Sequence, residues 1–266
     1  MTEEIVIPDA PAEASEQFHD SQPTTLSEYL ESLLVTVILA LFATTFVVQA
    51  FKIPSASMEG TLLVGDHLLV NKFIFGGTGS PFDKILPYRP IHRGDIIVFK
   101  YPYADHQHFV KRVIGLPGDR LKLEDQRMFL NGQLLNEPYV VHDRSAVYDP
   151  LNYAFPSGFS QLYAGEVQEE WAHEIKQYVS NGEIVVPPGK YFAMGDNRDH
   201  SSDSRYWGFV DRGAIMGRPF LIYWSVDASS ADYAQTTFGQ RLRGIFETVA
   251  HLPSRTRWSR MLRTVH

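Results

Sequence analysis

The chain has 266 residues, of which 44% are hydrophobic and 21% are charged, and its formal net charge at pH 7 is −7. This composition excludes a wholly disordered or multi-spanning protein, and the length suits one large or two modest folded domains. Because there is no cysteine, disulfides, thiolate catalysis and cysteine-ligated zinc are excluded as well.

The first residues are acidic and the last ones basic. Residues 1–31 contain acids but no Lys or Arg, and few apolar residues recur there with a regular period. We therefore expect residues 1–32 to form a disordered leader. Arginines gather instead in the basic tail that we assign to 228–266, at Arg241, Arg243, Arg255, Arg257, Arg260 and Arg263.

An apolar run follows the leader. Residues 33–51, LLVTVILALFATTFVVQAF, hold no charged side chain over 19 positions, enough for an α-helix to cross about 30 Å of hydrocarbon. We predict one transmembrane helix here. One alternative is a buried helix of a soluble core, but such a helix would usually keep a polar stripe. A cleaved secretory signal is the other alternative, because Val48-Gln49-Ala50 resembles a small-x-small cleavage site.

Local charge leaves the orientation of this helix open. Lys52 follows the run, whereas Glu28 and Glu31 precede it. The positive-inside rule, taken alone, mildly favours a cytoplasmic location for the residues after the helix, whereas an exported catalytic domain would lie on the other side of the membrane.

The body of the chain has the pattern of an antiparallel β protein. Short β-branched and aromatic runs alternate with Gly, Pro, Asn and Asp, and Asn131-Gly132 is typical of a type I′ hairpin turn. Helical patterns are confined to about 166–179 and 236–252. We predict a mainly β fold with a catalytic core at 52–135 and 183–227, interrupted by a smaller inserted region at 136–182.

Three segments carry side chains suited to catalysis. The first, IPSASMEGTLLVGD at 53–66, follows the apolar run directly. Pro54 has a fixed φ and biases the residue before it toward an extended conformation. This stretch therefore predicts a rigid turn that presents Ser55 and Ser57.

The second segment, HFVKRVIGLPGDR at 108–120, places a lysine in a strand. Strand alternation puts Lys111 on the same face as Phe109 and Val113. A lysine in water, with a pKa near 10.4, is a free base in only about one molecule in 2,500 at pH 7. An apolar setting lowers that pKa, and the neutral amine can then deprotonate a serine. Alternatively, the stem packs on the sheet and the ammonium reaches water.

The third segment, GDNRDHSSDSRYWGFV at 195–210, is dense in hydrogen-bonding groups. Asp196, Asp199 and Asp203 roughly resemble a calcium loop, but the spacing that ends in Glu is missing. We expect a hydrogen-bonded network here, with no metal and no cofactor.

These segments, in this order after an apolar helix, together with RGDIIVF at 93–99, resemble bacterial type I signal peptidases over about residues 33–226. The resemblance implies that Ser57 is the nucleophile and Lys111 the general base. It also implies that Ser55 and the Ser57 N–H form an oxyanion hole and that Ser201 orients the lysine. Two supporting ion pairs are implied: Asp196 with Arg112, and Asp203 with Arg205.

The resemblance further implies a shallow groove for small residues at the −1 and −3 positions of a signal peptide. Its walls would be Phe51, Ile53, Pro54, Met58, Leu62, Phe109 and Val110. Three positions depart from the family pattern. Gly60 stands where proline is common, which could loosen the turn after the nucleophile. Glu59 adds an acid, and His108 replaces a frequent acid.

The expected function is that of a membrane-bound serine endopeptidase that removes signal peptides from exported preproteins. Its partners would be those signal peptides and the lipid bilayer, with no nucleic acid, and its catalytic domain would lie on the outer face of the bacterial inner membrane. The rivals are a Ser/Lys autoprotease of the repressor type and a tethered β module that binds peptides without cutting them. For the tail we expect an amphipathic segment against lipid, or a partly disordered end.

Overall fold

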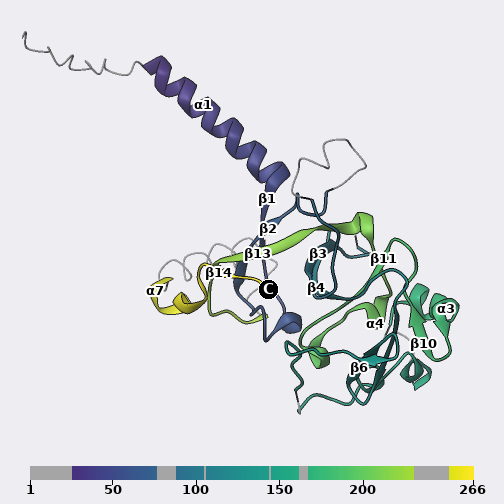
Figure 1. Cartoon of the computed structure of the whole chain (residues 1–266). Helices are drawn as coiled ribbons and strands as arrows, with labels where there is room; N and C mark the ends of the chain where they lie inside the picture. The colour runs from purple at the N-terminus through teal and green to yellow at the C-terminus, as the bar shows by residue number, and fades with distance from the viewer. Residues whose placement is uncertain (1–25, 77–87, 105, 144, 162–166, 231–251) are drawn as a thin grey trace, which may run out of the picture. The chain divides into compact units, whose positions relative to one another are not determined.

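The computed structural model describes residues 26–76, 88–104, 106–143, 145–161, 167–230 and 252–266 (Figure 1). Most of the predicted leader, and the centre of the basic tail with its predicted helix, lie outside the described residues. The chain divides into two units, Met1–Leu41 and Phe42–His266. The larger unit contains every strand described below.

The N-terminal helix differs from the predicted anchor in its bounds. Helix α1 covers Leu26–Phe42, a π-helical turn, η1, covers Ala43–Val47, and Val48–Lys52 forms strand β1. The prediction of one helix over 33–51 is therefore wrong at its end, because the β-branched residues there pair with β2 (Asp66–Asn71) instead. Residues 26–32, assigned to the leader, are helical.

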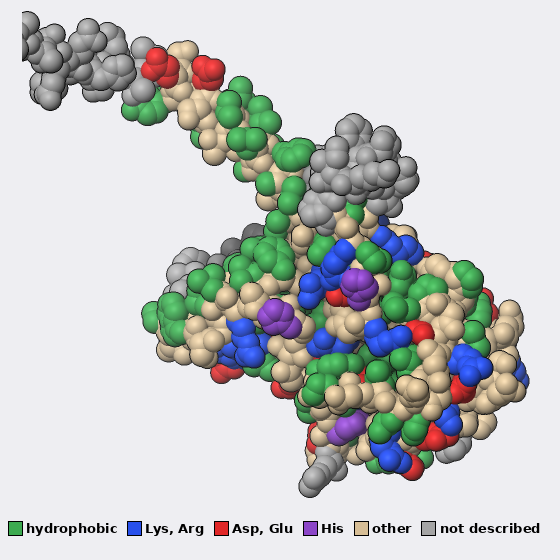
Figure 2. Space-filling model, in the orientation of Figure 1, with side chains coloured by type: hydrophobic (Ala, Val, Ile, Leu, Met, Phe, Trp, Pro, Cys, Tyr) green, Lys and Arg blue, Asp and Glu red, His purple; other side chains and the backbone are tan. Residues whose placement is uncertain are grey.

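No side chain of α1 is buried, and hydrophobic side chains run along its surface with acidic ones near its N-terminal end (Figure 2). Within the described part of the chain, we find no helix with the length and apolar character needed to cross a membrane.

The main sheet is antiparallel and has eight strands in the order β1-β2-β13-β3-β4-β11-β12, with β14 also paired to β13. Strands β3, β4 and β11 are visible side by side in Figure 1. The remaining strands of this sheet have the bounds β3 Ile96–Lys100, β4 His108–Gly115, β11 Lys190–Met194, β12 Val210–Asp211, β13 Ile215–Ser225 and β14 Arg263–Thr264. This sheet confirms the mainly antiparallel β prediction.

A second antiparallel sheet has the order β7-β6-β5-β10-β9, with β8 paired to β5. Its strands are β5 Arg120–Glu124, β6 Arg127–Leu130, β7 Gln133–Leu134, β8 Ala154–Phe155, β9 Val179–Ser180 and β10 Glu183–Val185. Strands from the predicted insertion thus pair with strands from the predicted core, so this sheet crosses the boundaries drawn at 136 and 182. The predicted hairpin is confirmed, because Asn131 and Gly132 have φ values of 50° and 81°.

The described helices and turns of the larger unit are short. The longest, α3 (Glu169–Tyr178), falls within the predicted helix at 166–179 and buries Trp171 and Ile175, four residues apart. The others are η2 Ala56–Met58, α2 Pro150–Tyr153, η4 Ser157–Gln161, η5 Arg198–His200, α4 Ser204–Trp207, η6 Arg212–Ala214, α7 Leu252–Arg255 and η7 Trp258–Arg260.

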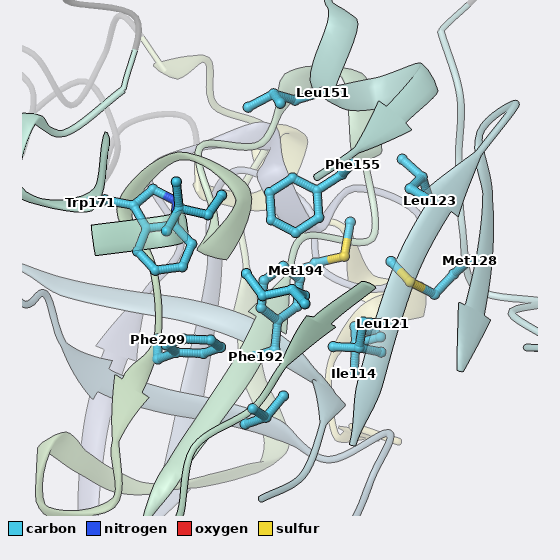
Figure 3. Packing of buried hydrophobic residues seen from close by; sticks show 13 residues of the cluster. Ile114, Leu121, Leu123, Met128, Leu151, Phe155, Trp171, Phe192, Met194 and Phe209 are labelled. Carbon is cyan, nitrogen blue, oxygen red and sulfur yellow. The ribbon is translucent and has the colours of Figure 1, made fainter. Parts of the chain in front are cut away.

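Two buried clusters position the site. One lies between the second sheet, α2, α3 and β11, where Phe155, Trp171 and Phe192 form its aromatic centre (Figure 3). The other lies beneath η2 and contains Ile53, Met58, Leu62, Leu68, Val70, Ile96, Val98, Ile222 and Val265. The second cluster holds the turn that carries Ser57, since Met58 and Leu62 are almost fully buried in it.

Candidate active site

Ser57 lies in a short 3-10 turn anchored on both sides. Ser55 before it is extended, with φ −132° and ψ 156°, and Met58 after it is buried in the core. The Ser57 carbonyl accepts a hydrogen bond from the Asn197 amide at 3.1 Å. The backbone of Ser57 is therefore fixed by a hydrogen bond as well as by the packing of Met58.

A tight turn follows Ser57. Glu59 has φ −59° and ψ 143°, Gly60 has φ 101°, and the Thr61 amide donates to the Met58 carbonyl at 3.1 Å. This is the geometry of a type II turn, whose third position requires the positive φ that glycine adopts without strain. Gly60 thus permits the hydrogen bond that closes the turn.

Lys111 projects from β4 toward Ser57. In the sheet it stands opposite Ile97 of β3, and its side chain is buried, with Nζ 5.4 Å from the centre of the Phe109 ring. Its Nζ donates a hydrogen bond to Ser57 Oγ at 2.7 Å, although 54 positions separate the two residues. The fold thus brings together the two side chains that the resemblance assigns to catalysis.

Burial lowers the pKa of Lys111 from 10.5 to about 8, because the ammonium form loses its hydration. The nearby Asp203 and Asp196 oppose this change, whereas Arg205 adds to it. At pH 7 roughly one molecule in ten then carries the free amine, compared with about one in 2,500 for a lysine in water. Lys111 is therefore suited to accept the proton of Ser57.

A buried ion pair supports the strand that carries Lys111. Arg112 Nε and Nη2 donate to the two carboxylate oxygens of Asp196 at 2.8 and 2.7 Å, and Arg112 Nη1 donates to the Gly94 carbonyl at 2.8 Å. The Arg112 guanidinium also lies 4.0 Å from the centre of the Tyr139 ring. This bidentate pair fixes β4 to the loop that follows β11.

Asp203 and Arg205 form a second buried pair. Arg205 Nε and Nη2 each donate to the Asp203 carboxylate at 2.8 Å, and both side chains are fully buried. Burial alone would raise the pKa of Asp203, but the Arg205 guanidinium outweighs it and holds that pKa below its usual value. Arg205 also donates to Asn152 and to the Arg198 carbonyl.

Ser55 and Ser201 differ in how the structure places them around Ser57. Ser55 Oγ is 3.5 Å from Ser57 Oγ, and Ser55 is exposed. Ser201 Oγ is buried and makes no hydrogen bond with Lys111; it lies near the Asp203 carboxylate instead and helps to lower the pKa of that group. A Cβ added to Gly195 would lie 2.3 Å from both Ser201 Oγ and the Ser57 carbonyl oxygen, and glycine is required there.

The predicted groove residues divide into core and surface. Ile53, Met58 and Leu62 are buried in the cluster beneath the Ser57 turn. Phe51 and Val110 are half-buried against the cluster that contains Met58 and Leu62. Phe109 packs against Trp207, and Pro54 is exposed. The rings of His108 and Phe51 pack in a T-shaped arrangement, with their centroids 5.6 Å apart.

Sequence reasoning missed two polar residues at the site. Thr61 Oγ1 donates to Asp196 at 2.6 Å and accepts from Arg112 Nη2 at 3.2 Å. Asn197 supplies the amide that binds the Ser57 carbonyl. Thr61 was visible only as part of the matched segment 53–66, and nothing local indicates a partner 135 positions away.

The acidic loop residues have protein partners. Asp199 accepts from Asn152 Nδ2 at 3.1 Å and from the Asp143 amide at 2.8 Å, while Asp196 and Asp203 bind arginines. Among the described residues, no three His, Cys, Asp or Glu side chains form a group that could hold a metal ion.

The buried pair of Ser57 and Lys111, joined by a hydrogen bond on an antiparallel sheet, has the geometry of a serine nucleophile beside a basic amine. The family model for signal peptidase, peptidase S26, matches residues 26–224, and the chain belongs to this family of peptidases.

Curated relatives agree with this assignment. A signal peptidase I of Pseudomonas fluorescens is 36% identical over 217 residues, covering 75% of this chain and 73% of the relative. One from Aquifex aeolicus is 34% identical, covering 75% of this chain and 85% of the relative. A solved signal peptidase I structure from Enterococcus faecalis is 32% identical and covers 49% of this chain and 97% of its own, with a TM-score of 0.33.

Proposed function

We propose that this chain removes N-terminal signal peptides from exported preproteins, with Ser57 as nucleophile and Lys111 as general base. The observation that carries this proposal is the 2.7 Å hydrogen bond between Lys111 Nζ and Ser57 Oγ, at a lysine whose pKa is lowered to about 8. Membership of the signal peptidase family supports the choice of substrate.

The reaction proceeds by acyl transfer. Neutral Lys111 takes the proton of Ser57, and the oxygen attacks the carbonyl carbon of the residue at −1. The developing oxyanion is stabilised by the Ser57 N–H and the Ser55 hydroxyl. Protonated Lys111 then returns its proton to the leaving amine. Water, activated by the Lys111 amine, then hydrolyses the ester and releases the signal peptide.

We assign recognition of small residues at −1 and −3 to the partly exposed side chains beside Ser57, namely Phe51, Pro54 and Val110. The buried Ile53, Met58 and Leu62 lie beneath them and fix the shape of this surface. A small side chain fits a shallow apolar surface, whereas a larger one would have to displace the core behind it.

We also propose that α1 associates with the lipid bilayer and that the catalytic unit lies on the outer face of the bacterial inner membrane. The helix supports this proposal because all its large apolar side chains are exposed: Leu26, Leu30, Leu33, Leu34, Val35, Val37, Ile38, Leu39, Leu41 and Phe42. Protease added to spheroplasts should degrade the catalytic unit, and protection of that unit until lysis would refute this orientation.

Cleavage of a purified preprotein tests the catalytic assignment. Ser57→Ala and Lys111→Ala should each reduce the rate by at least about a thousandfold, and Lys111→Arg should fail equally because a guanidinium stays protonated. Lys100→Ala is the matched control, since Lys100 is exposed at the end of β3. Turnover near the wild-type rate by the folded Ser57→Ala variant would refute the proposal, and peptide binding without cleavage by the wild type would favour a binding module.

A further inference from the structure

The end of the chain is bound to the main sheet. Within residues 256–266, here called the C-terminal segment, β14 pairs with β13, the Leu262 amide donates to the Ile222 carbonyl at 2.8 Å, and the Val265 amide donates to the Phe220 carbonyl at 3.1 Å. Figure 1 marks this end of the chain beside the main sheet. This part of the tail is therefore an ordered element of the catalytic unit.

Arg260 connects this segment to the chain just after the nucleophile. Its guanidinium donates to Asp66 at 2.6 Å from Nη2 and 3.1 Å from Nε, and Nη2 also donates to the Thr61 carbonyl at 3.0 Å. Asp66 is fully buried and accepts from the Leu63 amide at 2.8 Å. Arg260 thus binds both Thr61 and Asp66, the last residue of the segment 53–66.

Packing reinforces this connection. Val265 is 5% exposed and belongs to the buried cluster that contains Ile53, Met58 and Leu62. The main-chain oxygen of His266 lies 3.4 and 3.5 Å from the two terminal nitrogens of Arg112, at the outer limit of hydrogen bonding. The C-terminal segment therefore contacts two parts of the site: the turn that carries Ser57, and Arg112, the residue next to Lys111.

Thr61 lies between two fixed groups. Its carbonyl accepts from Arg260, while its hydroxyl donates to Asp196, which in turn binds Arg112 beside Lys111. If the Arg260 bond is lost, the Thr61 carbonyl loses its side-chain donor. Thr61 is then held by its amide bond to Met58 and by the bonds of its hydroxyl with Asp196 and Arg112. Small displacements of a reacting group are costly, because the attack geometry must be held within a fraction of an ångström.

We propose that Arg260 is a positioning residue for Ser57, and that the C-terminal segment is required for the catalytic geometry rather than only for attachment to lipid. This inference rests on the proposed roles of Ser57 and Lys111. Arg260 does not contact the substrate, so its removal lowers kcat more than it changes KM.

The test compares full-length Arg260→Ala, Arg260→Lys and Arg263→Ala. Arg263 is the matched control, because it is a basic residue of the same segment and is exposed. We expect Arg260→Ala to lower kcat about tenfold with KM within about twofold of wild type. Arg260→Lys should recover part of the loss, because an ammonium can still bind Asp66 but lacks the second arm toward Thr61.

A second readout does not depend on activity. Amide hydrogen exchange of the peptide covering 57–63 should be faster in Arg260→Ala than in Arg263→Ala, even in a Ser57→Ala background. Exchange equal to that of the control overturns the positioning role, and so does faster exchange with unchanged kcat. If the wild type cuts no preprotein, the proposed function fails, while the exchange comparison still decides whether Arg260 holds the turn.

Removal of Arg260 also leaves the buried Asp66 carboxylate without its cation, which could unfold the protein. The double variant Arg260→Met with Asp66→Asn removes both charges and keeps an acceptor for the Leu63 amide. It should show the same loss of kcat at a temperature where circular dichroism reports a folded protein. Wild-type kcat in this folded double variant would refute the proposal.

Discussion

At the scale of single residues, opposing influences determine the state of Lys111. Asp203 and Asp196 favour its charged form, but each of these carboxylates is already bound to an arginine. Loss of hydration therefore prevails, and the pKa is lowered from 10.5 to about 8. Between these two values the unfolded chain binds more protons than the folded one, so this lysine makes the fold more stable as pH rises through that window.

The same shift predicts the pH dependence of catalysis. With Lys111 as the proposed general base, the free amine would be the active form, so kcat/KM should rise about tenfold per pH unit below pH 8 and level off above it. Initial rates with a soluble signal-peptide substrate from pH 6 to 10, in buffers of constant ionic strength, would measure this profile. A rate that is flat from pH 6 to 9, or a midpoint near the value of an ordinary lysine, would contradict the role of Lys111.

At the scale of elements, the turn Met58–Thr61 determines where Ser57 is held. Gly60 has φ 101°, and a Cβ added there would lie 2.7 Å from Val141 Cγ2. Val141 is itself fixed, since its amide donates to the Asp196 carbonyl at 2.9 Å. Any side chain at position 60 therefore strains the backbone and presses on the loop that contacts Asp196.

Substitution of Gly60 should destabilise this turn in a graded way. Gly60→Ala should lower the free energy of unfolding by about 1–2 kcal/mol through its positive φ. Gly60→Pro, which introduces the residue common in the family, should cost more, because proline is locked near φ −65°. Urea unfolding monitored by tryptophan fluorescence measures both changes.

Gly213→Ala is the control for these variants, because Gly213 has no positive φ and an added Cβ meets nothing within 4 Å. The kcat of the Gly60 variants should fall along with their stability, since the same turn holds Ser57. Gly60→Pro with the stability of wild type would show that the turn adopts another conformation.

At the scale of the whole molecule, the site is assembled by contacts between distant parts of the chain. Ser57 meets Lys111 across 54 positions, Arg112 meets Asp196 across 84, and Arg260 meets Asp66 across 194. Local pattern predicted the strands, the Asn131-Gly132 hairpin and the apolar setting of Lys111, since each depends on neighbouring residues. The pairing of Ser57 with Lys111 came only from the resemblance.

Some features were beyond prediction for physical reasons. The end of the apolar run becomes β1 because β2 is available as a partner, and a run of apolar residues does not reveal that partner. Likewise, the burial of Ile53, Met58 and Leu62 was not predicted, because apolar residues that line a surface and those that fill a core look alike in sequence. The contacts of Arg260 depend on a C-terminal segment outside the matched motifs.

The division of the chain into two units leads to the final prediction. No residue of α1 is buried, so deletion of residues 1–41 should leave the thermal midpoint of the catalytic unit within about 2 °C of wild type. Turnover of a short soluble peptide should also be unchanged. Cleavage of a preprotein in lipid vesicles should instead fall by at least about tenfold, because enzyme and substrate would no longer be confined to one surface.

The variant Leu34→Arg with Ile38→Arg keeps the helix length, places charge on one face and should reproduce this selective loss. Equal cleavage of the vesicle-bound preprotein by wild type and both variants would refute a role for α1 at the membrane, whereas a lowered thermal midpoint would show that the helix supports the catalytic fold.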